Sequence, residues 1–163
     1  VLSPWMTVEE AYLLASFMKS LSRRARLAMA PARFVGEDDH YPKDVDGNAV
    51  SPPKFVIRAE KCPNRLGVEA VLRHFESDLL DLDDIVARVG RGEFDAVYLV
   101  GGDPEPWITP EQVSKLSAVS LVAVQDILPS AASEVATYVL PGGSFAERDG
   151  TFVNHAGLAQ NIR

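Results

Sequence analysis

The chain has 163 residues, 47% hydrophobic and 24% charged, a length and composition that predict one compact domain with its own core. Its 16 basic and 23 acidic residues give a formal net charge of −7 without any long Lys/Arg cluster, which argues against nucleic acid or an anionic membrane as a partner of the surface as a whole. Cys62 is the only cysteine, so intrachain disulfides and cysteine-built iron–sulfur or zinc sites are excluded.

The N-terminal residues lack the charged start and apolar core of a signal peptide. No apolar segment approaches the ~20 residues that cross a bilayer. We therefore expect a cytoplasmic protein without direct membrane insertion. The chain begins without Met and enters a helix almost at once, which indicates a fragment of a longer subunit.

A core-packing helix is predicted from Thr7 to about Ser22. Thr7 and Glu10 have the spacing of a capping box, in which each side chain accepts a hydrogen bond from an unpaired backbone N–H at the helix start. Apolar residues then recur at helical spacing, at Val8, Ala11, Leu14, Ala15, Met18 and Leu21. The aromatic residues nearby, Trp5, Tyr12 and Phe17, are interpreted as packing residues and not as a binding stripe.

A short strand is expected at 26–29, followed by an irregular acidic insert at 30–53. Asp38, Asp39 and His40 are residue types that bind metals, and 44–48 is loosely similar to a calcium loop. The closing Glu of the calcium pattern is missing, so we interpret the insert as a solvated acidic loop.

The middle of the chain predicts an edge strand and two helices. Residues 54–58 have the composition of the strand, and a turn at 62–64 leads into a helix from Gly67 to Phe75. Acidic residues at 81–84 favour the start of a further helix through Val89.

Two strand-helix-strand steps follow between Phe94 and Pro141. The apolar runs lack strict alternation, as in parallel strands that are covered on both faces. Thr109, Pro110 and Glu111 form a typical helix start. The predicted elements are a strand at 94–100, a helix at 109–116, a strand at 120–126, a helix at 130–136 and a strand at 138–140.

The loops after these strands are expected to open toward one crevice, because the carboxyl ends of parallel strands share one edge of a sheet. These loops are 101–107, 125–130 and 141–144. A simple nucleotide-binding Rossmann-like domain is a further alternative, but Gly101-Gly102-Asp103 does not match G-x-G-x-x-G and no helix start follows it closely.

The C-terminal third carries the residues that suggest a family. Gln125-Asp126 opens a segment that continues through Ser130 to Tyr138-Val139-Leu140-Pro141, and Phe145-Ala146-Glu147-Arg148-Asp149-Gly150-Thr151 follows. This pattern, with the first helix and Val100-Gly101-Gly102-Asp103-Pro104, resembles the molybdopterin oxidoreductase family. Within it, the likeness is greatest to the molybdopterin-type domain of the large iron–sulfur subunit of NADH-quinone oxidoreductase.

The resemblance implies a fold, a cofactor and a set of contacts. The implied fold is α/β, with a doubly wound and mostly parallel sheet that has helices on both faces. It is Rossmann-like, as in domains of the formate dehydrogenase and DMSO reductase type. Residues 1–163 would form one such domain. The implied cofactor is molybdopterin guanine dinucleotide, with no iron–sulfur cluster in this part of the chain. The implied contacts are Gly101, Gly102, Asp103, Gln125, Asp126 and Ser130.

The resemblance also implies a role in a complex. The chain would be a fragment of an oxidoreductase large subunit, and it would support electron transfer that is carried out elsewhere in the subunit. Its partners would be the rest of that subunit and the neighbouring subunits. Through this complex the chain would lie beside a membrane. The fragment alone is expected not to catalyse, and no catalytic or metal-ligating residue is identified.

Two departures from the family pattern keep an alternative open. Ala132 replaces a threonine and Thr137 replaces an aspartate. The alternative is a non-catalytic scaffold domain that has lost cofactor binding and docks to partner subunits.

Overall fold

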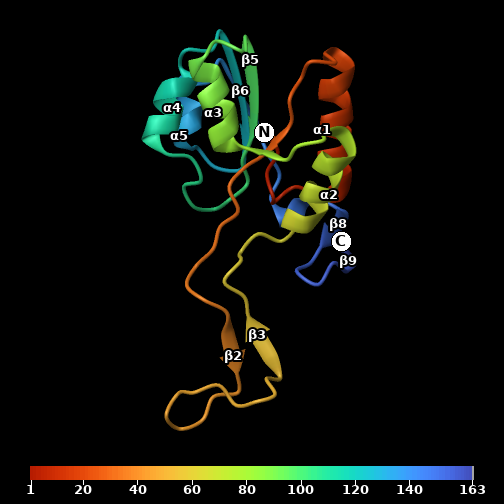
Figure 1. The fold of residues 1–163 in the computed structure, drawn as a ribbon, viewed down its shortest axis with the longest axis vertical. Helices are drawn as coiled ribbons and strands as arrows, with labels where there is room; N and C mark the ends of the chain where they lie inside the picture. Colours follow the sequence, from red (N-terminus) through yellow and green to blue (C-terminus); the bar gives the residue numbers. More distant parts are fainter. Residues whose placement is uncertain (163) are drawn as a thin grey trace. The chain divides into compact units, whose positions relative to one another are not determined.

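The computed structural model describes residues 1–162 and divides the chain into two compact units (Figure 1). The first unit comprises residues 1–31 and the chain from residue 63 onward, and the second comprises residues 32–62. The helices of the first unit are α1 (Val8–Leu21), α2 (Arg65–Phe75), α3 (Leu82–Gly90), α4 (Pro110–Leu116), α5 (Ala131–Val135) and the 3-10 turn η1 (Phe145–Glu147). Its strands are β1 (Ala28–Met29), β4 (Leu80–Asp81), β5 (Ala96–Val100), β6 (Leu121–Asp126), β7 (Tyr138–Pro141), β8 (Gly150–Val153) and β9 (Ala159–Ile162).

The largest sheet of the first unit is parallel and three-stranded, ordered β5-β6-β7. Its register pairs Val97 with Val122 and Gln125 with Leu140. The prediction of two consecutive strand-helix-strand steps with parallel strands is therefore confirmed. The predicted start of the helix after β5 is also confirmed. Thr109 caps α4, because its Oγ1 accepts a hydrogen bond from the backbone N–H of Gln112.

Residues 1 and 2 link this sheet to a second parallel pair, β1-β4. The backbone nitrogen of Val1 donates to the Tyr98 carbonyl at 2.7 Å, and the N–H of Leu2 donates to the Ala28 carbonyl at 2.8 Å. Leu2 also forms a parallel bridge with Met29. The sequence had not indicated that these two residues, or β4, would join strands, because each stretch is too short to show a periodic pattern.

Side chains of β5 alternate between two hydrophobic clusters, as the pleat of a strand requires. Val97 and Leu99 pack with α3, α4 and α5, whereas Tyr98 and Val100 pack with α1 and α2. In Figure 1 these two groups of helices lie on opposite sides of β5 and β6. The first unit is therefore mixed α/β, with short parallel sheets. Helices cover β5 and β6, whereas β7 is exposed, so the expectation of strands covered on both faces is wrong for β7.

The start of α1 is capped as predicted. The Glu10 N–H donates to Thr7 Oγ1 at 3.2 Å, and the Thr7 N–H donates to Glu10 Oε2 at 2.8 Å. The predicted packing of Phe17 and Leu21 is wrong, because these side chains are 53% and 66% exposed. The buried face of α1 is centred on small residues, Ala11 and Ala15, and Phe17 and Leu21 fall beside it.

Asn64 joins three parts of the first unit from a fully buried position. Its Nδ2 donates to the Met6 carbonyl at 2.7 Å, and its Oδ1 accepts from the Val153 N–H at 2.7 Å. Val153 belongs to β8, which pairs with β9 in an antiparallel hairpin. The sequence had suggested only a turn at Asn64.

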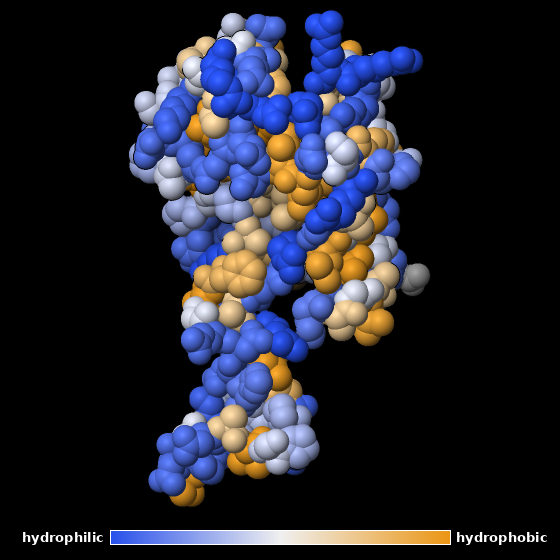
Figure 2. Space-filling view, in the orientation of Figure 1, coloured by the Kyte–Doolittle hydropathy of each residue, from blue (hydrophilic) through white to orange (hydrophobic). Residues whose placement is uncertain are grey.

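The second unit contains an antiparallel pair, β2 (Asp39–Tyr41) with β3 (Phe55–Ile57). The insert expected to be irregular thus contains a strand, whose three residues are too few and too polar to be recognised in sequence. Tyr41 and Phe55 stack across the pair at 5.0 Å between ring centroids. Figure 2 shows apolar residues on the surface of this unit, and Val45, Phe55 and Ile57 are exposed.

The metal-ligand types of the insert are engaged by protein groups. Asp38 accepts from Arg58 Nη1 at 2.6 Å, and Asp44 Oδ1 accepts from the N–H groups of Asp46 and Asn48. Residues 1–162 contain no group of three or more His, Cys, Asp or Glu side chains arranged to hold a metal ion. None of their helices has both the length and the apolar composition needed to cross a bilayer.

Candidate functional site

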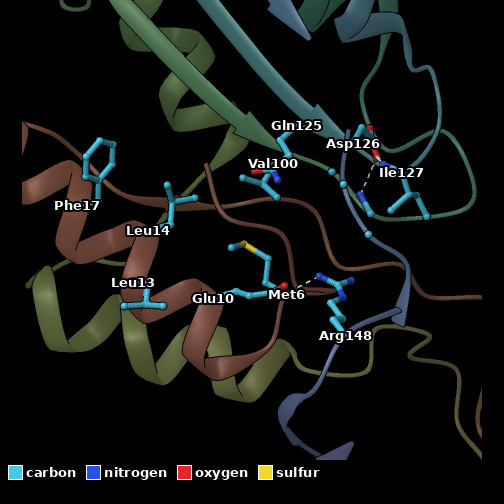
Figure 3. A pocket seen from close by; sticks show the side chains of 14 residues that line it. Met6, Glu10, Leu13, Leu14, Phe17, Val100, Gln125, Asp126, Ile127 and Arg148 are labelled. Atoms are coloured by element: carbon cyan, nitrogen blue, oxygen red, sulfur yellow. Dashed lines mark hydrogen bonds and ion pairs between the residues drawn. The ribbon is translucent and has the colours of Figure 1, made fainter. Parts of the chain in front are cut away.

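The ends of β5, β6 and β7 line one pocket of about 400 Å³ (Figure 3). This volume lies within the roughly 300–1,000 Å³ typical of small-molecule sites. The prediction that the three loops open toward a common crevice is confirmed. The lining residues are Met6, Glu10, Leu13, Leu14, Phe17, Val100, Gly101, Gly102, Gln125, Asp126, Ile127, Gly142, Gly143 and Arg148.

Asp126 is the buried acidic residue at the floor of this pocket. Its Oδ1 accepts from the N–H groups of Gly102 and Ile127, both at 2.8 Å, and its Oδ2 accepts from the indole N–H of Trp107 at 2.9 Å. A carboxylate with three donors is held in one orientation. Asp126 therefore ties the β5 loop to the end of β6.

Asp103 has a similar structural environment in a second pocket, of about 340 Å³, which Asp126 also borders. Its Oδ2 accepts from the Trp5 indole N–H at 3.3 Å and its Oδ1 from the Glu105 N–H at 2.9 Å. The predicted contacts thus divide into two groups. Gly101, Gly102 and Gln125 line the first pocket, and Asp103 and Ser130 line the second.

Gln125 presents its amide at the end of β6. The Tyr98 hydroxyl donates to Gln125 Oε1 at 2.8 Å, so the NH₂ group is the part of this amide that remains for a ligand. Burial raises the pKa of Tyr98 above its ordinary value of 10.0. Tyr98 consequently acts as a neutral hydroxyl donor at physiological pH.

The two departures from the family pattern lie outside the first pocket. Ala132 is fully buried in the cluster beneath α3, α4 and α5. Thr137 Oγ1 accepts from the Val122 N–H at 3.1 Å, near the amino ends of β6 and β7. Thr137 therefore acts in strand pairing at the amino edge of the sheet, whereas Ala132 packs into the core directly after Ala131, which borders the second pocket.

The other wall of the pocket comes from α1, and sequence reasoning had missed it. Glu10, Leu13, Leu14 and Phe17 are spaced i, i+3, i+4 and i+7, which places them on one helix face. Leu13 is 67% exposed. This second apolar stripe, offset from the Ala11 and Ala15 stripe that packs into the core, is the sequence feature that could have indicated the pocket wall.

Arg148 is the cation of the pocket and was also missed. Its Nη1 donates to Glu10 Oε2 at 2.8 Å, and its Nη2 donates to the Trp5 carbonyl at 3.2 Å. Its Nε is buried without a hydrogen-bond partner among residues 1–162. Arg148 lies inside the segment that resembles the family, but the resemblance implied no contact at this residue.

No protein-family model matches the chain, but about half of it is similar to curated subunits of oxidoreductases. It is 36% identical over 86 residues to the F420-dependent formate dehydrogenase 1 subunit alpha of Methanococcus maripaludis, which covers 51% of this chain and 12% of the relative. It is 35% identical over 84 residues to the NADPH-Fe(3+) oxidoreductase subunit alpha of Geobacter sulfurreducens, covering 50% of this chain and 10% of the relative. It is 33% identical over 85 residues to the G 2 subunit of the NADH-quinone oxidoreductase of Rhizobium meliloti, covering 51% of this chain and 10% of the relative.

These matches establish similarity to oxidoreductase subunits over half of the chain. The matched part spans only about a tenth of the length of each curated relative. Each relative is named as one subunit of an enzyme.

Proposed function

We propose that the chain is part of the large subunit of an electron-transferring oxidoreductase similar to NADH-quinone oxidoreductase, and that it contributes one wall of a site for molybdopterin guanine dinucleotide. The observation that carries this proposal is the pocket where three parallel strands end, lined by backbone at Gly101, Gly102 and Gly142. Open α/β sheets bind ligands at this edge. The similarity to formate dehydrogenase and NADH-quinone oxidoreductase subunits supports the reaction class.

The residues present fit a guanine or pterin ring better than a metal. The pocket combines an apolar wall from Leu13, Leu14 and Phe17 with the Gln125 amide and the Glu10–Arg148 pair. Such a wall suits a planar heterocycle, and the polar groups suit its N–H and carbonyl edge. When bound, the cofactor would supply the redox chemistry, and this chain would bind and orient it.

The same proposal covers fold and setting. We propose that the parallel strands belong to a doubly wound sheet, and that the chain works in the cytoplasm within a complex whose other subunits carry the electron donor and acceptor. The alternative is a scaffold domain, favoured by the engagement of both Asp103 and Asp126 by tryptophan indoles. In that case the carboxylates hold loops together instead of contacting a ligand.

Thermal melting of the chain with added guanine nucleotide tests the proposal. Guanosine monophosphate at 100 times its dissociation constant should stabilise the chain by about 2.7 kcal/mol, which raises the melting temperature by several degrees for a chain of this size. Denatured protein from a host that makes the cofactor should also release a fluorescent pterin, with molybdenum or tungsten present. Absence of both the shift and the pterin would contradict cofactor binding and favour the scaffold.

A further inference from the structure

We propose that Arg148 and Glu10 together recognise the lactam edge of the bound heterocycle, an adjacent ring carbonyl and N–H as found in guanine and in pterin. This inference rests on the proposed function and deepens it. Neither residue was among the contacts that the sequence suggested. In Figure 3 the Glu10 and Arg148 side chains point toward each other, and both line the pocket.

Arg148 has hydrogen-bonding capacity that the protein does not use. A guanidinium carries five N–H donors, and two of them bind Glu10 and the Trp5 carbonyl. The side chain is only 18% exposed, and Nε has no acceptor among the described residues. Nε itself is buried, but Nη1 and Nη2 each keep a second N–H beyond the bonds to Glu10 and Trp5, and a carbonyl oxygen of a ligand in the adjoining pocket would accept from these.

Glu10 places a free acceptor beside those donors. The hydrogen bonds that it accepts from Thr7 and from Arg148 both go to Oε2, so Oε1 is available to a ligand. A guanidinium donor next to a carboxylate acceptor complements a ring carbonyl next to a ring N–H. In the same orientation, the amino group and unprotonated ring nitrogen of adenine would place donor against donor at Arg148 and acceptor against acceptor at Glu10.

The apolar face of α1 provides the surface on which such a ring could lie. Leu13 and Phe17 are more than half exposed and border the pocket with Met6. From Glu10 to Phe17 the helix rises about 10 Å, since each residue adds 1.5 Å. This length accommodates a bicyclic ring with its polar edge at Glu10 and its apolar face toward Phe17.

The experiment measures, by calorimetry, the affinities of guanosine monophosphate, adenosine monophosphate and 6-hydroxymethylpterin for the wild-type chain and for Arg148→Met. The wild type should prefer the guanine nucleotide or the pterin over adenosine monophosphate by ~10-fold or more, the contribution of one charged hydrogen bond. Arg148→Met should remove most of that preference. Whichever of the guanine nucleotide and the pterin shows the loss is the ring that occupies this part of the pocket.

Two further variants and a folding check distinguish a loss of ring recognition from a general loss of binding or of folding. Phe17→Ala should weaken guanosine and adenosine monophosphate equally, because it removes a stacking surface from an exposed position. Leu21→Ala, also more than half exposed on α1 but outside the pocket, is the matched control and should change neither affinity. Circular dichroism verifies that each variant is folded.

The outcomes separate this inference from the proposed function. Binding by the wild type with the same ring preference in folded Arg148→Met overturns the assignment of Arg148 and Glu10 and leaves the pocket as a cofactor site. No binding of any of the three compounds by the wild type contradicts both.

Discussion

Gly101 is a residue whose lack of a side chain shapes the pocket floor. A Cβ at this position would lie 2.2 Å from Asp126 Oδ2 and 2.3 Å from Asp126 Cγ. The carboxylate is held by three N–H donors, so it cannot move aside freely. Gly101 is thus required for the attachment of the β5 loop to β6, in addition to leaving backbone open to a ligand.

Gly101→Ala is expected to destabilise the chain by about 1–3 kcal/mol, the usual cost of overpacking a tight site, and to weaken guanine nucleotide binding. Urea unfolding and calorimetry would measure the two effects. Gly90→Ala is the matched control, because a Cβ there meets no atom within 4 Å and the residue ends α3. An unchanged unfolding free energy in Gly101→Ala would show that Asp126 is not confined as described.

Sequence reasoning selected Gly101, Gly102 and Asp126 but not their relationship. The motif suggested that the aspartate faces a ligand, whereas its oxygens accept from Gly102, Ile127 and Trp107. A local pattern shows which residue types follow a strand, and it carries no information about a partner such as Trp107, 19 residues away. Ser130 and the other predicted contacts remain predictions.

At the scale of elements, Glu76 connects the end of α2 to α1 and to the segment before β1. Its side chain is 9% exposed, its Oε1 accepts from Lys19 Nζ at 2.8 Å and from the Leu27 N–H at 2.9 Å, and Arg26 lies 3.4 Å away. Desolvation alone would raise the pKa of this carboxyl. The hydrogen bonds and the two cations outweigh it and lower the pKa below its ordinary value of 4.5.

Because the pKa of Glu76 is lower in the folded state, its stabilising contribution is present above pH 4.5 and is lost as pH falls through the folded-state pKa. We expect Glu76→Gln to lower the free energy of unfolding by about 2 kcal/mol at pH 7, since Lys19 and Leu27 lose a charged acceptor. The difference from wild type should shrink in acid. Urea unfolding of wild type and Glu76→Gln between pH 3 and 7 measures this difference in free energy. Glu93→Gln is the control, because Glu93 is a 39% exposed partner of Arg91. A difference that does not change with pH would contradict the lowered pKa of Glu76.

At the scale of the whole molecule, the chain is divided into two units. The two ends of the second unit lie side by side, because the Lys61 N–H donates to the Arg33 carbonyl at 2.9 Å and Phe34 forms an antiparallel bridge with Glu60. The second unit can therefore be shortened without separating the points where the chain enters and leaves it.

Replacing residues 35–59 by an Asn-Gly turn, which favours tight antiparallel hairpins, should leave the first unit folded. Its melting temperature is expected to change by no more than ~3 °C, and its affinity for guanosine monophosphate should not change. Removal of the β8–β9 hairpin is the contrasting variant. It should be strongly destabilising, because Asn64 and Glu9 bind the backbone of Val153 and Thr151. Loss of cooperative melting after the first replacement would show that the first unit depends on the second.

The sequence by itself determined the local elements: the capped starts of α1 and α4, the apolar runs of β5 and β6, and the glycine-rich turns after them. These depend on residues within a few positions of one another, so their patterns are visible in one dimension. Only the tertiary structure decided that α1 forms the opposite pocket wall, that Arg148 meets Glu10 across 138 positions, and that Val1 and Leu2 pair with β5 and β1. Such contacts form when the packing of helices on sheets brings together residues that are far apart in the sequence. The spacing of residues along the chain does not show which of them will meet.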